Sequence, residues 1–214
     1  TKPDWSAEQE LWKQGYLQVA GIDEVGRGPL AGPVMAAAVV FSPTFKTRNL
    51  PGLNDSKKLS AIARERLVPR IQQLAQGVGI GRAEHHEIDA LGIVEATRTA
   101  MTRAIRQLAN QVDHLLVDAL PLSCDDLPCR VIIHGDALCS SIAAASIVAK
   151  VARDSIMEEM DELYPGYGFA QNKGYPTEAH MTALEQLGPT PIHRRSFAPV
   201  RRVLGHERDV GSHT

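Results

Sequence analysis

The sequence has few cysteines and little net charge. Its three cysteines are an odd number and show no Cys-x-x-Cys spacing, which argues against a disulfide framework and against a structural zinc site. They lie at Cys124, Cys129 and Cys139. The formal net charge is only -2 at pH 7, so the overall charge does not draw this protein to nucleic acid. Any phosphate binding must come from a local basic patch.

The sequence also lacks a long hydrophobic run. The stretch 142–149 is too short to span a membrane and is flanked by charge, and no charged-then-apolar leader precedes it. With 214 residues and 43% hydrophobic content, the chain can bury one sizeable core. We expect a cytoplasmic monomer without membrane contact, with one domain over 1–205 and a flexible tail over 206–214.

Two adjacent carboxylates are present instead, Asp23 and Glu24, followed at once by Gly26-Arg27-Gly28. Apolar residues on both sides predict two strands joined by a glycine-rich hairpin loop. Successive side chains of a strand point to opposite faces, so the two acids share a metal site only if the strand twists, bulges or ends there. A surface ion pair beside an ordinary turn is the alternative.

Predicted helices and strands alternate along the rest of the chain. Further strands are predicted at 77–83, 114–118 and 130–134. Helices are predicted at 5–15 with Ser6 as N-cap, from Ser60 to 74, as one or two helices over 88–108, from Ser140 or Ser141 to 164, and from Thr177 to Gly188. This order predicts an α/β fold with a mixed sheet flanked by helices.

Two more acids, Asp118 and Asp136, also follow predicted strands. Ligands bind at strand ends in α/β sheets, and carboxylates without His or Cys suit Mg²⁺ or Mn²⁺. Two such ions can stabilise the attacking and leaving oxygens of a phosphoryl displacement. Asp154 is a fifth candidate, although an ion pair with Lys150 one turn earlier is the simpler interpretation.

The basic residues near the C-terminus form the local patch that phosphate binding needs. Arg194 and Arg195 precede a second pair at 201–202, and apolar neighbours indicate that the segment docks on the core. A solvated tail is the alternative. The histidines His85, His86, His134 and His180 show no regular metal spacing and are predicted to be structural or exposed.

Five ordered motifs resemble those of bacterial ribonuclease HII, from about Val19 to Gly205. They are Asp23 to Pro29, Leu53 to Leu59, Gly135-Asp136, Ile142 to Val151 and Lys173 to Thr177. The resemblance implies a ribonuclease H-like fold with a five-stranded sheet and a helical C-terminal segment. It also implies a metal-dependent endonuclease that hydrolyses the RNA strand of RNA/DNA hybrids and cuts 5′ to single ribonucleotides in duplex DNA.

The same resemblance implies roles for individual residues. The catalytic and metal-binding acids are Asp23, Glu24, Asp118 and Asp136, with two Mn²⁺ or Mg²⁺ ions. Gly26, Arg27 and Gly28 sense the ribose 2′-hydroxyl, and Tyr175 stacks on the following sugar. The residues implied to contact backbone phosphates are Asn54, Ser56, Lys57, Arg194 and Arg195. The sequence contains no clear peptide motif for contact with a DNA sliding clamp.

Four positions depart from the family pattern: Ala119, His134, Ala137 and Asn172. None removes an acid, so activity is expected. The alternatives are a type III ribonuclease H, for which too few residues precede Asp23 to form the extra domain, and a hybrid-binding protein that has lost catalysis. A phosphatase for small esters would also fit the carboxylates, but it does not explain the Gly-Arg-Gly turn.

Overall fold

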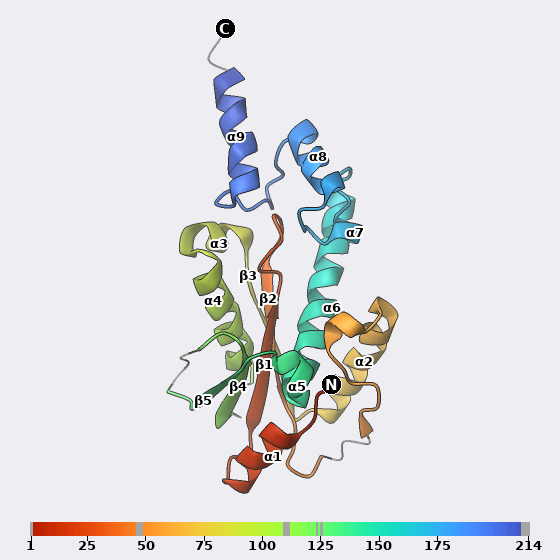
Figure 1. The fold of residues 1–214 in the computed structure, drawn as a ribbon, viewed down its shortest axis with the longest axis vertical. Helices are drawn as coiled ribbons and strands as arrows, with labels where there is room; N and C mark the ends of the chain where they lie inside the picture. Colours follow the sequence, from red (N-terminus) through yellow and green to blue (C-terminus); the bar gives the residue numbers. More distant parts are fainter. Residues whose placement is uncertain (1, 46–48, 109–111, 123, 125, 211–214) are drawn as a thin grey trace. The chain divides into compact units, whose positions relative to one another are not determined.

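The computed structural model contains a five-stranded mixed sheet with the strand order β3-β2-β1-β4-β5 (Figure 1). The structure describes residues 2–45, 49–108, 112–122, 124 and 126–210. The strands are β1 (Val19–Val25), β2 (Val34–Val40), β3 (Gly77–Ala83), β4 (His114–Asp118) and β5 (Cys129–Ile132). β1 pairs antiparallel with β2 and parallel with β4, which itself pairs parallel with β5. The predicted fold class is confirmed.

Each predicted helical segment is present. The helices are α1 (Ser6–Lys13), α2 (Ala61–Leu74), α3 (His85–Leu91), α4 (Ile93–Arg106), α5 (Gly135–Leu138), α6 (Ser140–Leu163), α7 (Phe169–Asn172), α8 (Glu178–Leu187) and α9 (Ala198–Val210), with a 3-10 turn η2 at Ser56–Lys58. Of these, α5, α7 and α9 are additional to those predicted from periodicity. Ser60 and Thr177 cap α2 and α8, because their side chains accept hydrogen bonds from the N–H groups of Ala63 and His180.

The chain divides into two compact units. Unit 1 comprises Thr1–Val25, Met35–Arg82 and Thr97–Ala152, and unit 2 comprises Gly26–Val34, Ala83–Ala96 and Arg153–Thr214. Unit 1 therefore contains most of the sheet. The turn after β1 belongs to unit 2, together with the C-terminal helices.

Unit 1 buries the sheet between helices, with α4 on one side of the strands and α6 with α2 on the other in Figure 1. β2 is buried along its whole length, which explains its unbroken apolar sequence. Gly21 is the point of closest approach, because a Cβ there would overlap the backbone of Ser141 at the start of α6. β1 and the N-terminal end of α6 thus pack without a side chain between them.

Unit 2 has its own small cores. One contains Met157, Tyr167 and Phe169, and the other contains Leu184 of α8 and Val200 of α9. The C-terminal helical segment is thus confirmed. Its backbone is helical as far as Val210, within the segment 206–214 for which a flexible tail is predicted, and residues 211–214 lie outside the described part.

Two local predictions are wrong. The N-cap of α1 is Trp5, and the carboxylate of Asp4 accepts the hydrogen bond from the N–H of Ser6. Asp136 does not end a strand: β5 stops at Ile132, and Asp136 lies in the first turn of α5. The chain turns between them at His134, whose φ of 58° is left-handed.

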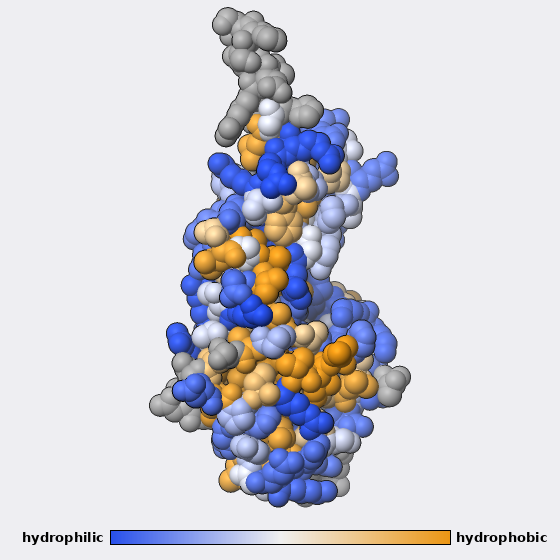
Figure 2. Space-filling model, turned by 60° about the vertical axis from the view of Figure 1, so that its left-hand side comes forward, coloured by the Kyte–Doolittle hydropathy of each residue, from blue (hydrophilic) through white to orange (hydrophobic). Residues whose placement is uncertain are grey.

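The surface mixes polar and apolar groups. Figure 2 shows one face on which apolar residues gather among hydrophilic ones. Ile133, next to the edge strand β5, is 70% exposed. Among the described residues, no helix is both long enough and apolar enough to cross a membrane.

Candidate active site

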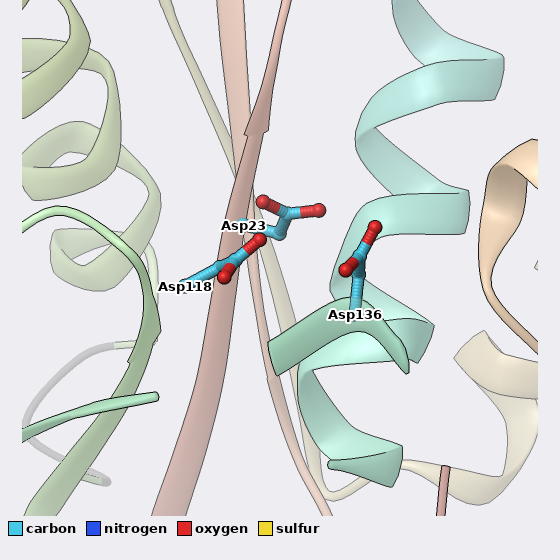
Figure 3. A group of neighbouring side chains, drawn as sticks. All are labelled: Asp23, Asp118 and Asp136. Carbon is cyan, nitrogen blue, oxygen red and sulfur yellow. The ribbon is translucent and has the colours of Figure 1, made fainter. Parts of the chain in front are cut away.

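Three carboxylates from distant parts of unit 1 converge on one point. Asp23 comes from β1, Asp118 from the end of β4 and Asp136 from α5, and Figure 3 shows their side chains turned toward one another. One oxygen of each lies within 4.8 Å of the others. The structure therefore brings together three of the four predicted acids.

The register of two parallel strands explains the first pair. Ile22 of β1 lies opposite Val117 of β4, so the next residues, Asp23 and Asp118, stand at the same level. Neighbouring side chains at one level of a parallel pair share a face of the sheet. One acid at the same place in each strand is therefore enough to bring two of the three carboxylates together.

Asp23 is buried, at 5% exposure. Burial raises the pKa of this carboxyl well above its usual range, and the nearby charges of Glu24 and Asp118 raise it further. Hydrogen bonds from the Ser146 hydroxyl and the N–H of Glu24 act in the opposite direction. A buried group surrounded by like charges is stabilised in its ionised form by a cation, so this donor set fits a divalent metal.

Asp118 and Asp136 have strong hydrogen-bond donors of their own. Asp118 Oδ1 accepts a hydrogen bond of 2.8 Å from the N–H of Gly135, which ties β4 to the start of α5. Burial raises the pKa of Asp118, and the charge of Asp136 adds to this. The ammonium of Lys57 lies 2.8 Å from Asp136 Oδ2, and this contact raises the pKa of Lys57. One exposed lysine thus compensates part of the negative charge.

The loop before α2 is fastened beside the cluster. The Ser56 and Ser146 hydroxyls lie 2.9 Å apart, and Ser146 also donates to Asp23. Asn54 accepts a hydrogen bond from the N–H of Asp55, and Asp55 caps the turn that carries Lys57. Ser56 is only 5% exposed, so its hydroxyl faces the protein. Sequence reasoning missed Ser146, whose signal is a small polar residue within the apolar run of α6.

Glu24 is not a member of the three-carboxylate group. It follows Asp23 directly and lies one residue before β1 ends at Val25. Its charge still reaches Asp23 and raises the pKa of that residue.

In unit 2, the loop after β1 surrounds two buried arginines. Arg194 is fully buried, and its guanidinium donates to the carbonyl oxygens of Gly26, Arg27 and Gly32 at 2.6, 3.1 and 3.0 Å. The predicted phosphate contact of Arg194 stays a prediction, because its guanidinium is bound here by backbone carbonyls. Burial lowers its pKa to about 9, which leaves it charged at neutral pH.

Arg153 is the second buried arginine, and sequence reasoning missed it. Its guanidinium donates to the carbonyls of Ala31, Pro33 and Lys173. A Cβ on Gly26, whose φ is +95°, would overlap the Arg153 side chain. Glycine at this position thus serves both the left-handed backbone and the close approach of Arg153.

Tyr175 lies beside the same loop. Its ring is within 3.4 Å of where a Cβ on Gly28 would stand, and its side chain is 41% exposed. The preceding turn is held by Asn172, whose amide donates to the carbonyl of Tyr167 and whose Oδ1 accepts from the N–H of Gly174. Gly26, Arg27, Gly28 and Tyr175 are therefore neighbours in unit 2.

The remaining predicted contact, Arg195, is exposed. Its backbone N–H and that of Ser196 donate to the carboxylate of Asp89. Asp89 thus fixes the segment that follows Arg194 and leaves the Arg195 side chain on the surface.

Solved structures with the same fold are ribonucleases H. The ribonuclease H2 of Pyrococcus horikoshii OT3 matches 90% of this chain and 99% of its own at a TM-score of 0.77 and 25% identity. The structure of the PCNA:RNase HII complex from Archaeoglobus fulgidus matches 86% of this chain at a TM-score of 0.72, also at 25% identity. The fold and the carboxylates define a metal-dependent nuclease of the ribonuclease H class.

The sequence comparisons are more specific. The model described as Ribonuclease HII matches residues 20–200. The ribonuclease HII of Desulfitobacterium hafniense (strain Y51) is 56% identical over 197 residues, which are 92% of this chain and 75% of that protein. The chain belongs to the ribonuclease HII family. It is a ribonuclease H endonuclease that depends on a divalent metal, as the resemblance implied.

Proposed function

We propose that this protein hydrolyses the RNA strand of RNA/DNA hybrids and cuts 5′ to single ribonucleotides in duplex DNA, leaving 3′-hydroxyl and 5′-phosphate ends. The convergence of Asp23, Asp118 and Asp136 supports the chemistry. The Gly26 to Gly28 loop beside Tyr175 supports the choice of substrate. We also propose that both units act as one catalytic domain, as a monomer in the cytoplasm.

The three clustered acids hold the metal in this proposal, and Glu24 completes the set from the adjacent position of β1. Two Mn²⁺ or Mg²⁺ ions supply the charge that stabilises the attacking and leaving oxygens of an in-line displacement. The protein's part is to fix the carboxylates. β1 and β4 set Asp23 and Asp118 level, while Gly135 orients Asp118 and Ser146 orients Asp23.

Lys57, Ser56 and Asn54 belong to the loop fastened beside these acids. Lys57 is the exposed cation of the three, and its ammonium is free to move from Asp136 to a substrate phosphate. Ser56 and Asn54 contribute mainly by holding the loop, because Ser56 faces Ser146 and Asn54 binds its neighbour's N–H.

Substrate choice follows from the peptide groups around Arg194. A trans peptide unit is planar, with its C=O and N–H antiparallel. Since the carbonyls of Gly26 and Arg27 point at the Arg194 guanidinium, the N–H groups of Arg27 and Gly28 point away from it. We propose that these donors meet the ribose 2′-hydroxyl and its phosphate, while Tyr175 stacks on the next sugar.

The deciding experiment is cleavage of a duplex that contains one ribonucleotide, with Mn²⁺ or Mg²⁺ present. Asp136→Asn is expected to bind this duplex and to lose turnover, because it keeps the side-chain shape and removes the charge. An all-DNA duplex serves as the uncut control, and a phosphomonoester should not compete. Absence of cleavage by the wild type would falsify the assignment.

The Archaeoglobus fulgidus relative was solved in complex with PCNA. We propose nucleic acid as the principal partner of this chain. Titration of a sliding clamp against the protein would measure clamp binding separately.

A further inference from the structure

Two buried histidines in unit 2 form a chain of hydrogen bonds that ends at Tyr175. His180 and His193 are both fully buried, and their Nε2 atoms lie 3.1 Å apart. On one side, His193 Nδ1 is 2.9 Å from the backbone N of Thr190. On the other side, His180 Nδ1 is 2.8 Å from the carbonyl oxygen of Tyr175.

The backbone donor at Thr190 fixes the direction of this chain. Because an N–H group only donates, His193 Nδ1 must be an unprotonated acceptor, and the proton of the neutral ring sits on Nε2. His193 Nε2 then donates to His180 Nε2. The proton of His180 is therefore on Nδ1, where it donates to the carbonyl of Tyr175. Each ring has one tautomer, and each bond has a donor and an acceptor.

Charge and packing favour the same neutral state. Burial lowers the pKa of both rings, that of His193 to about 4, so neither ring carries a positive charge at neutral pH. The rings pack in an aromatic group with Tyr167 and Phe169, whose centroids lie 5.3 to 5.7 Å from that of His193. The two histidines and their hydrogen bonds are therefore a fixed structural link and not a proton carrier.

This hydrogen-bonded link between His180 and His193 joins two segments that contact the Gly-Arg-Gly loop. His193 forms an isolated bridge with Ala31, and the next residue is Arg194. Tyr175 accepts the last bond through its backbone, while its ring lies beside Gly28. The hydrogen bonds of the two histidines thus reach the backbone of the residue whose ring lies beside this loop.

We propose that His180 and His193 are positioning residues for substrate recognition, which hold Tyr175 against the Gly26 to Gly28 loop. This inference rests on the proposed function of Tyr175 in stacking on the substrate. The histidines touch no substrate themselves, so their effect should appear in binding and in discrimination rather than in the chemical step.

The test is a double-mutant cycle between His193→Phe and Tyr175→Ala. Phe keeps a ring in the aromatic group and removes both nitrogens. His193→Asn is the second variant, because its amide can still serve Thr190 but has no atom in the place of Nε2. His86→Phe is the matched control, since His86 takes no part in these bonds and is not fully buried. KM and kcat are measured on a duplex with one ribonucleotide, and Mn²⁺ affinity is measured by calorimetry.

We expect His193→Phe and His193→Asn to raise KM about fivefold to tenfold, a fraction of what an aromatic stacking contact contributes, with kcat and Mn²⁺ affinity retained. With Tyr175 already replaced, adding His193→Phe should raise KM no further. In an Asp136→Asn background, preference for the ribonucleotide duplex over an all-DNA duplex should fall by a similar factor.

Two results would overturn the inference. If Tyr175→Ala raises KM and the His193 variants do not, or if the two effects multiply, the histidines do not act through Tyr175. If Tyr175→Ala itself leaves KM unchanged, the proposed role of Tyr175 fails together with the inference. The Asn variant keeps the test decisive if the Phe variant does not fold.

Discussion

Lys57 donates a hydrogen bond to Asp136, with Nζ 2.8 Å from Oδ2, although 79 residues separate them in sequence. The lysine side chain is 78% exposed and the aspartate side chain 5% exposed. A mobile cation therefore lies over a fixed carboxylate of the cluster. This pairing gives Lys57 two partners in turn: Asp136 in the free protein and, in our proposal, a phosphate in the complex.

Replacing Lys57 should change metal and substrate binding in opposite directions. Lys57→Met removes a cation that competes with the metal for Asp136, so Mn²⁺ affinity should rise about two- to fivefold, the range of an exposed ion pair. KM for the nucleic acid should rise, because a phosphate contact is lost. Calorimetry with Mn²⁺ and steady-state kinetics measure the two effects. Lys58→Met, which removes the exposed neighbouring lysine, is the control, and equal effects of both variants would contradict this prediction.

Asp23→Asn should abolish activity and stabilise the metal-free protein. The pKa of Asp23 is raised by burial, Glu24 and Asp118, so ionisation of this group at neutral pH opposes folding. Removing the charge should raise the melting temperature in EDTA by about 2 to 4 °C for each kcal/mol gained. Excess Mn²⁺ should stabilise the wild type more than the variant. A lower melting temperature of the variant in EDTA would show that the charge is well compensated.

Arg194→Lys should impair recognition while leaving the metal site intact. Lysine keeps the charge but has no planar fork to reach three carbonyls, so the peptide groups of Gly26 and Arg27 lose their fixed orientation. We expect KM for the ribonucleotide duplex to rise at least about tenfold, the effect of losing hydrogen bonds to a buried charged group. Arg66→Lys on the exposed face of α2 is the matched control. Unchanged KM in the Arg194 variant would refute its role in shaping the loop.

His193 should make the folded protein less stable as the pH is lowered from about 6.5 toward 4. The pKa of His193 is about 4 in the folded protein because of burial, against about 6.5 in an unfolded chain. Within this window the unfolded chain binds a proton that the folded protein does not, so unfolding is favoured, by at most about 3 kcal/mol for this residue. Urea unfolding at pH 7.5, 6 and 5 measures the trend. His193→Phe should show a smaller loss than the wild type, and an identical loss would contradict the prediction.

Much of the site was predictable because local pattern and chemistry agree there. Asp23 and Asp118 end or nearly end apolar segments, and the parallel pairing of β1 with β4 then sets them level. Asp136 was predicted in the right place for the wrong reason. It reaches the cluster from α5, after a left-handed turn at His134 that no hydrophobic period reveals.

The two buried arginines that hold the Gly26 to Gly28 loop could not be predicted from the spacing of residues in the sequence. Arg194 lies in a basic stretch that resembles a surface patch, and Arg153 lies on a helix beside Asp154. Both are buried because the loop 26–33 turns its carbonyls inward, and carbonyl groups carry no signature in a sequence. Ala119, where the family pattern has Gly, adopts a φ of 49°, which shows why glycine is expected there.

The sequence alone was enough to predict the order of the strands and longer internal helices, the four acids and their suitability for a hard cation, because periodicity and side-chain chemistry are local properties. Only the tertiary structure decided that Glu24 stands apart from the three clustered carboxylates, that Lys57 pairs with Asp136, and that Arg194 serves the loop from within. It also joined His180 to His193. These relationships depend on which face a side chain takes and on what lies across from it, and both are set by packing between segments far apart in the chain.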